Sequence, residues 1–151
     1  MNIVLYQPEI PQNTGNIART CAAIGVSLHL IKPLGFSIDD KHVKRAGLDY
    51  WNLLDLTVYD GWKSFIKQKA EANLYFVSTK GENYYHDIKY PEDSYFIFGP
   101  ETRGIPETIL KQYWERVIRI PMISDARSLN LSNAVAVVIY EALRQHNFNS
   151  L

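Results

Sequence analysis

Apolar residues follow two alternating patterns along this chain. Short runs rich in β-branched and aromatic residues predict buried strands, whereas longer stretches with apolar residues three and four positions apart predict helices. The predicted strands are Asn2–Tyr6, Ser27–Lys32, Leu56–Tyr59, Leu74–Ser78, Tyr95–Phe98 and Val117–Ile120. The predicted helices are Asn16–Gly25, a segment from an N-cap at Asp60 to Ala70, Pro106–Tyr113 with its proline in the first turn, and Leu131–His146.

This alternation is typical of an α/β fold in which a mostly parallel sheet carries helices on both faces. In such folds, ligands bind at the carboxyl ends of the strands. The chain has 151 residues and no linker or low-complexity tract, so we expect a single domain over residues 1–151. The last predicted helix has an apolar stripe from Leu131 to Ala142, whereas Tyr140 falls on a second, mixed face that suits an interface.

Composition narrows the classes of function. Sixteen Lys and Arg residues balance sixteen Asp and Glu, so any nucleic acid must be held by a local basic patch. The single cysteine, Cys21, excludes an internal disulfide, and its helical spacing with Ile17 and Ile24 favours a buried thiol over a nucleophile. The apolar run from Ile3 to Tyr6 is too short for a signal peptide or a membrane span, so we expect a cytoplasmic protein without membrane association.

Several common sites are missing from the sequence. After Tyr6, a dinucleotide-binding or conventional methyltransferase domain would have a glycine-rich turn, but Gly15 is the single glycine of that segment. No Gly-x-x-x-x-Gly-Lys-Ser/Thr motif occurs, which argues against a nucleotide triphosphatase. The four histidines are scattered, so no metal is expected. Asp39 and Asp40 fit a helix cap and a first-turn charge better than a catalytic pair.

Three segments at predicted strand-to-helix junctions are unusually polar. Asn13–Arg19 offers Asn side chains and backbone N–H groups to a phosphate or ribose, although helix capping and a surface arginine explain it equally well. Phe98–Gly104 predicts a tight loop at a strand end, whose Glu101 and Arg103 are either functional or a solvated ion pair.

The third segment, Ile120–Ala134, runs from apolar backbone into a loop dense in Ser, Asn and Arg. Capping of the following helix explains one of Ser128, Asn130 and Ser132, but not all three. The remaining polar groups therefore indicate a ligand.

Together, these segments resemble the three sequence motifs of the SPOUT methyltransferases, in the expected order. The whole chain, from Ile3–Pro11 through Arg45–Tyr50 to Tyr140–Ala142, is similar to the small tRNA 2'-O-methyltransferases that modify the wobble nucleotide. The resemblance implies a deep trefoil knot in the C-terminal half, which ordinary topology rules argue against. It also implies a homodimer with active sites at its interface.

The activity implied by the resemblance is transfer of a methyl group from S-adenosyl-L-methionine to the ribose 2'-hydroxyl of nucleotide 34, a cytidine or modified uridine in the tRNA anticodon loop. S-adenosyl-L-homocysteine would be the product. The implied cofactor-binding residues are Val77, Ser78, Thr79, Phe98, Gly99, Glu101, Gly104, Ile120, Pro121, Met122, Ser128, Leu129 and Asn130.

The implied catalytic residues are Arg19, Glu101, Asn130 and Tyr140, with Ser128 in support. For RNA docking we expect contributions from Asn13, Asn16, Lys41, Lys44, Arg45, Arg103 and Arg127. The cluster from Lys41 to Arg45 also fits a solvated helix face equally well.

The family assigns Arg19 to the 2'-oxygen. A guanidinium has a pKa above about 12 and no acceptor lone pair, so we expect Arg19 to stabilise the developing alkoxide or bind the adjacent phosphate. The proton then leaves to water or to another side chain. Two alternatives stay open: a SPOUT enzyme that acts on another tRNA or rRNA nucleotide, and a non-catalytic RNA- or nucleotide-binding module with the same fold.

Overall fold

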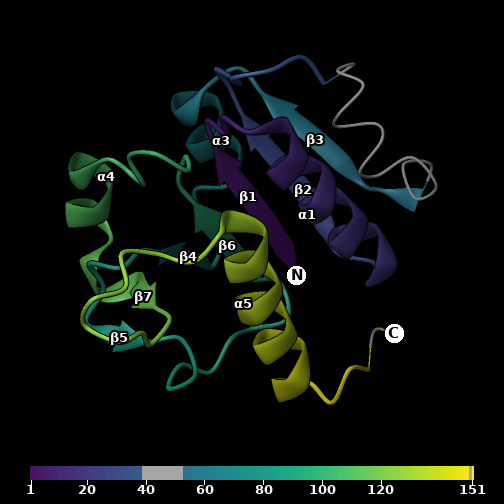
Figure 1. Cartoon of the computed structure of the whole chain (residues 1–151). Helices are drawn as coiled ribbons and strands as arrows, with labels where there is room; N and C mark the ends of the chain where they lie inside the picture. The colour runs from purple at the N-terminus through teal and green to yellow at the C-terminus, as the bar shows by residue number, and fades with distance from the viewer. Residues whose placement is uncertain (39–52, 150) are drawn as a thin grey trace.

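Strands and helices alternate along the computed structural model, which describes residues 1–38, 53–149 and 151 (Figure 1). Its strands are β1 (Asn2–Tyr6), β2 (Ser27–Ile31), β3 (Leu56–Tyr59), β4 (Leu74–Val77), β5 (Asn83–Tyr84), β6 (Tyr95–Phe98) and β7 (Val117–Arg119). Its helices are α1 (Pro11–Ala23), α3 (Trp62–Gln68), α4 (Glu107–Gln112) and α5 (Leu131–Gln145), with a 3-10 helix, η2, at Trp114–Arg116.

The described strands form one sheet in the order β3-β2-β1-β6-β4-β7-β5. Every pairing between them is parallel, so the predicted parallel sheet is confirmed. β1 lies between β2 and β6, with Asn2 opposite both Ser27 and Tyr95. Parallel neighbours bring their carboxyl ends to the same edge, so the loops after β1, β6, β4 and β7 meet there.

Helices cover both faces of the sheet, as the alternation predicts. Ile3 and Leu5 of β1 pack into a core shared with α1 and α5, whereas Val4 and Tyr6 pack into a second core shared with α3 and α4. α1 and α5 also contact each other, and Figure 1 shows them over the same face. Within residues 1–38 and 53–149, no helix is both long and apolar enough to cross a membrane.

Cys21 lies on the buried side of α1, as predicted. The thiol belongs to the core between α1, α5 and the sheet, and burial raises the pKa of Cys21 to about 12. A thiol that stays protonated is a poor nucleophile. The interpretation of Cys21 as a core residue is therefore confirmed.

The predicted start of the first helix is wrong. α1 begins at Pro11 rather than Asn16, because proline suits the first turn and the polar Asn13 and Thr14 are buried there rather than exposed in a loop. Its N-cap residue is Ile10, whose apolar side chain makes no capping hydrogen bond. Neither Asn13 nor Asn16 therefore serves as the cap considered from the sequence.

Other predicted boundaries shift by a residue or two. Asp60 does not cap α3, since Gly61 occupies that position and the Asp60 carboxylate lies 3.1 Å from Nζ of Lys32 instead. Pro106 is the N-cap of α4 rather than part of its first turn. The predicted strands ending at Lys32, Ser78 and Ile120 each stop one residue earlier. β5 and η2 were not predicted, because two or three residues carry no readable period.

Candidate active site

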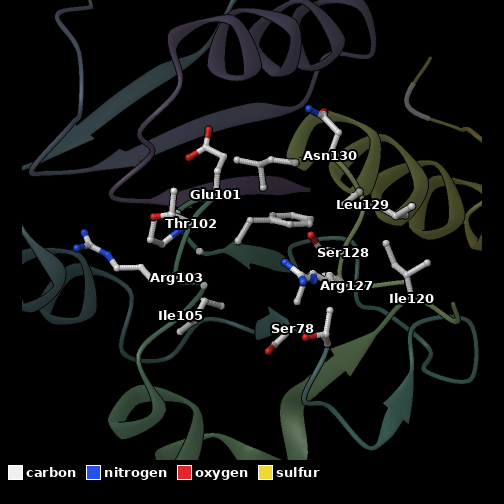
Figure 2. Close-up of a pocket in the computed structure, with 18 of the residues that line it drawn as sticks. Ser78, Glu101, Thr102, Arg103, Ile105, Ile120, Arg127, Ser128, Leu129 and Asn130 are labelled. Carbon is white, nitrogen blue, oxygen red and sulfur yellow. The ribbon is translucent and has the colours of Figure 1, made fainter. Parts of the chain in front are cut away.

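A pocket of about 580 Å³ lies at the carboxyl edge of the sheet (Figure 2). Its wall comes from loops after three neighbouring strands, β4, β6 and β7, and from the start of α5. Ile10 and Asn13, at the start of α1, complete it. The three polar segments of the sequence therefore converge in one place, where the parallel sheet predicts a ligand site.

The predicted cofactor residues line this pocket, with one exception. Two of them, Val77 and Phe98, are the last residues of β4 and β6, and Ile120 directly follows β7. The others lie in the loops that follow these strands. The exception is Pro121, which lines a smaller neighbouring pocket of about 240 Å³. The structure thus brings together a set of residues that the sequence scatters over three segments.

The loop from Gly99 to Ile105 forms one wall of the pocket and is folded tightly on itself. Gly104 has a φ of +68°, and its N–H donates to the carbonyl of Pro100 at 3.0 Å. A Cβ on Gly99 would lie 2.3 Å from the backbone nitrogen of Ile105. The predicted tight loop is confirmed, and both glycines are needed for it.

Glu101 in this loop binds the beginning of α1. Its carboxylate accepts hydrogen bonds from the backbone N–H groups of Glu9 and Ile10, at 2.8 and 3.2 Å, and from the side-chain amide of Asn13 at 3.1 Å. Figure 2 shows Glu101 pointing towards the purple N-terminal segment. Glu101 therefore supplies, from a different segment, the acceptor and negative charge that a helix N-terminus favours.

Asn130 is linked to Glu101 through Asn13. The Asn130 side-chain oxygen accepts from the backbone N–H of Ser132 at 2.9 Å and so caps α5, while its amide donates to the side-chain oxygen of Asn13 at 3.0 Å. Asn13 thus joins the two residues that the family motifs single out. Glu101 and Asn130 are therefore connected by two hydrogen bonds through a third side chain.

Arg103 does not form a solvated pair with Glu101. It donates to the side-chain oxygen of Gln7 at 3.0 Å and lies 3.9 Å from the carboxylate of Glu9, and in Figure 2 it points away from Glu101. Gln7, directly after β1, has a φ of 50°, a left-handed conformation that is uncommon outside glycine. Such backbone strain is often found beside functional sites.

Sequence reasoning missed Glu9 and Thr102, which meet beside the pocket. The Glu9 carboxylate accepts from the backbone N–H and the hydroxyl of Thr102, at 3.2 and 2.7 Å. The hydrogen bond from the Thr102 hydroxyl is the main reason that the pKa of Glu9 lies below its usual range. The one available signal was an acidic residue enclosed by Pro8 and Pro11 just after a buried strand.

Other predicted residues lie outside the pocket of their own chain. Arg19 and Asn16 are exposed on α1, and Tyr140 is exposed on α5. Arg103 and Arg127, which we expected to bind RNA, do line the pocket. The remaining predicted RNA-binding residues, Lys41, Lys44 and Arg45, lie outside the described residues, as do Asp39 and Asp40.

The chain resembles known methyltransferases in sequence and in structure. Residues 1–140 match the model of the SpoU rRNA Methylase family. A tRNA (cytidine(34)-2'-O)-methyltransferase of Saccharophagus degradans is 52% identical over 148 residues, which cover 97% of this chain and 96% of the relative.

Two solved structures place the fold in the same group. One, described as giving structural insights into the 2-OH methylation of C/U34 on tRNA, has a TM-score of 0.93 and 47% identity, covering 97% of this chain and 95% of that one. An AdoMet-bound rRNA methyltransferase from Sinorhizobium meliloti has a TM-score of 0.85 and 25% identity, covering 95% of this chain and 55% of that one. With fold and sequence in agreement over nearly its whole length, this chain belongs to the SpoU methylase family of SPOUT methyltransferases.

Proposed function

We propose that this chain transfers a methyl group from S-adenosyl-L-methionine to the ribose 2'-hydroxyl of nucleotide 34 of tRNA, a cytidine or modified uridine. The observation that carries the proposal is the pocket of about 580 Å³ where the start of α1 and the loops after β4, β6 and β7 converge. The Saccharophagus degradans relative and the structure concerned with C/U34 support this substrate, since the similarity spans nearly all of both chains.

The residues of the pocket suit this cofactor. An adenine needs an apolar slot with a few polar groups at its edge. Phe98, Ile120 and Leu129 offer the apolar surface, and Ser78 and Ser128 lie beside them. The AdoMet-bound relative from Sinorhizobium meliloti supports the assignment.

The sulfonium of the cofactor supplies an already activated methyl group. The protein must therefore align the 2'-hydroxyl with it and stabilise the charge that develops on oxygen. We assign Arg19 to that charge or to the adjacent phosphate, and Tyr140 to contact with the nucleotide. Glu101 and Asn130 hold the start of α1 and the start of α5 in place through Asn13. The proton leaves to water or to another side chain.

A homodimer with sites at its interface forms part of the proposal. α1 and α5 pack together, and the outer side of α5 exposes the apolar side chains of Val137 and Tyr140. An interface over this surface would cover them and bring Arg19 and Tyr140 next to a pocket. Such an arrangement would account for the positions of both residues outside the pocket of their own chain.

We also propose the trefoil knot that the family resemblance implies. β7 is inserted in the sheet between β4 and β5, both of which precede it in the chain. The segment after β7 then joins the same pocket as the loops after β4 and β6. The support for a threaded C-terminal half is the membership of the SpoU family. A tRNA substrate would place the protein in the cytoplasm.

The family description favours a second candidate, because it refers to rRNA. In this case the same chemistry would act on an rRNA nucleotide or on another position of tRNA. The pocket and its residues would be unchanged, and RNA docking alone would differ. The position of the methyl group distinguishes the two candidates.

The test is incubation of the purified protein with methyl-labelled S-adenosyl-L-methionine and tRNA, followed by nuclease digestion and mass spectrometry. We expect the label in the ribose of nucleotide 34. A matched tRNA with a 2'-deoxyribose at position 34 should take up no label. Label in a base or at another nucleotide would overturn the assignment, and cofactor binding without transfer would indicate a binding module.

A further inference from the structure

Two carboxylates on different segments each hold the backbone of the other segment. Glu101, after β6, accepts from the backbone N–H groups of Glu9 and Ile10. Glu9, before α1, accepts from the backbone N–H and the hydroxyl of Thr102. We call this contact between Glu9, Ile10, Glu101 and Thr102 the carboxylate exchange. Hydrogen bonds to ionised groups are shorter and stronger than neutral ones, so the exchange fixes the two segments relative to each other.

Glu9 takes part in the exchange without lining the pocket. Its side chain is 27% exposed, and the guanidinium of Arg103 lies 3.9 Å away. The hydroxyl of Thr102 and the guanidinium of Arg103 both favour its ionised form, so the pKa of Glu9 is lowered. A charged group placed this way, with its oxygen 2.7 Å from the Thr102 hydroxyl, is a geometric restraint on the pocket loop.

The restraint extends to the rest of the site through adjacent residues. Thr102 follows Glu101 directly, so a displacement of Thr102 moves the carboxylate that holds the start of α1. Asn13 lies in the first turn of that helix and contacts both Glu101 and Asn130. Arg19 lies further along the same helix. Misplacement by about 1 Å at a reacting centre can cost a hundredfold in rate.

We propose that Glu9 is a positioning residue for the methyl-transfer site. By holding Thr102, it fixes Glu101 against α1 and sets the distance between the pocket loop and the helix that carries Arg19. This role rests on the proposed function for its effect on rate, but its structural part does not.

The experiment compares Glu9→Ala, Glu9→Gln and Thr102→Val with Asp60→Asn. Glu9→Ala removes both acceptor oxygens, whereas Glu9→Gln keeps one oxygen on a side chain of the same length. Thr102→Val removes only the hydroxyl donor. Asp60→Asn is the matched control, because Asp60 is an exposed carboxylate in an ion pair with Lys32 and does not line the pocket.

In single-turnover methyl transfer at saturating cofactor, Glu9→Ala should lower the rate by about a hundredfold. Glu9→Gln should recover part of it, and Thr102→Val should lose less than Glu9→Ala. The double variant Glu9→Ala with Thr102→Val should be no worse than Glu9→Ala, because both remove the same contact. The KM for tRNA should change little.

Amide hydrogen exchange in the protein without ligand gives a second readout. Exchange at residues 99–105 and 9–13 should rise together in Glu9→Ala and stay unchanged in Asp60→Asn. Wild-type exchange and wild-type transfer in Glu9→Ala would overturn the proposal, as would a rise at residues 99–105 alone. If the wild type transfers no methyl group, the proposed function fails, while the exchange data still decide the role of Glu9.

Discussion

Gly99 offers a direct test of how the pocket loop is built. A Cβ at this position would lie 2.3 Å from the nitrogen of Ile105 and 2.4 Å from the carbonyl carbon of Gly104. Comfortable contacts between such atoms are about 3.5–4.0 Å long. Because both contacts are with backbone, no side chain can move aside, and Gly99→Ala must open the loop by about 1 Å.

The structure sets the size of the effect. Overpacking against a fixed backbone costs about 1–3 kcal/mol. Opening the loop also breaks the hydrogen bond from Gly104 to Pro100, worth about 1 kcal/mol. We therefore expect Gly99→Ala to lower the free energy of unfolding by about 2–4 kcal/mol. Loss of one or two cofactor contacts would weaken binding of S-adenosyl-L-homocysteine about five- to thirtyfold.

Urea unfolding and isothermal titration calorimetry measure the two effects. Gly61→Ala is the control, since nothing lies within 4 Å of its Cβ, and its unfolding free energy should stay within about 1 kcal/mol of wild type. Gly81→Ala should fall between them, because its Cβ would lie 3.0 Å from the carbonyl carbon of Ile118. Equal stability and affinity in Gly99→Ala and Gly61→Ala would refute the reasoning.

Three further predictions concern charge. Burial lowers the pKa of His29 to about 4 from the 6.5 of the unfolded chain. The neutral ring therefore contributes about 3 kcal/mol to the free energy of unfolding above pH 6.5, and this contribution is lost as the pH falls towards 4. In urea unfolding, His29→Gln should lack this loss of stability between pH 6.5 and 4. Arg19→Lys should retain more methyl transfer than Arg19→Ala if the residue acts through charge, and equal losses in steady-state kcat/KM would contradict that role. Arg127 lies at the pocket wall, and Arg127→Ala should weaken tRNA binding in filter-binding assays. The slope of log affinity against log salt concentration should fall by about 1, and an unchanged slope would exclude a phosphate contact.

The layered fold was predictable because buried parallel strands must be continuously apolar. Ile3 to Leu5 and Phe96 to Phe98 are such runs, and both lie in the centre of the sheet. The start of α1 was not predictable in the same way. Asn13 and Thr14 are polar yet buried, so the composition of the first turn of α1 is that of an exposed loop. The carboxylate that binds the two residues just before this helix comes from Glu101, which no local pattern contains.

Much of the pocket wall could be predicted because the family resemblance implies its residues, and two of the polar motifs, Phe98–Gly104 and Ile120–Ala134, supply many of them. The contact between Glu9 and Thr102 could not, since each side chain taken alone is an ordinary polar residue in a loop. The positions of Arg19 and Tyr140 show another limit. A motif assigns a residue to a site without giving its position in space, and neither residue lines the pocket.

The placement of β1 between β2 and β6 has a consequence for synthesis of the protein. While the ribosome has released only the first half of the chain, one side of β1 lacks the strand that will pair with it, and the residues before α1 lack the Glu101 carboxylate that binds them. An open parallel edge of apolar residues is a template for aggregation. Fragments that end before Tyr95 should therefore depend on chaperones to remain dispersed, whereas the completed chain closes that edge itself.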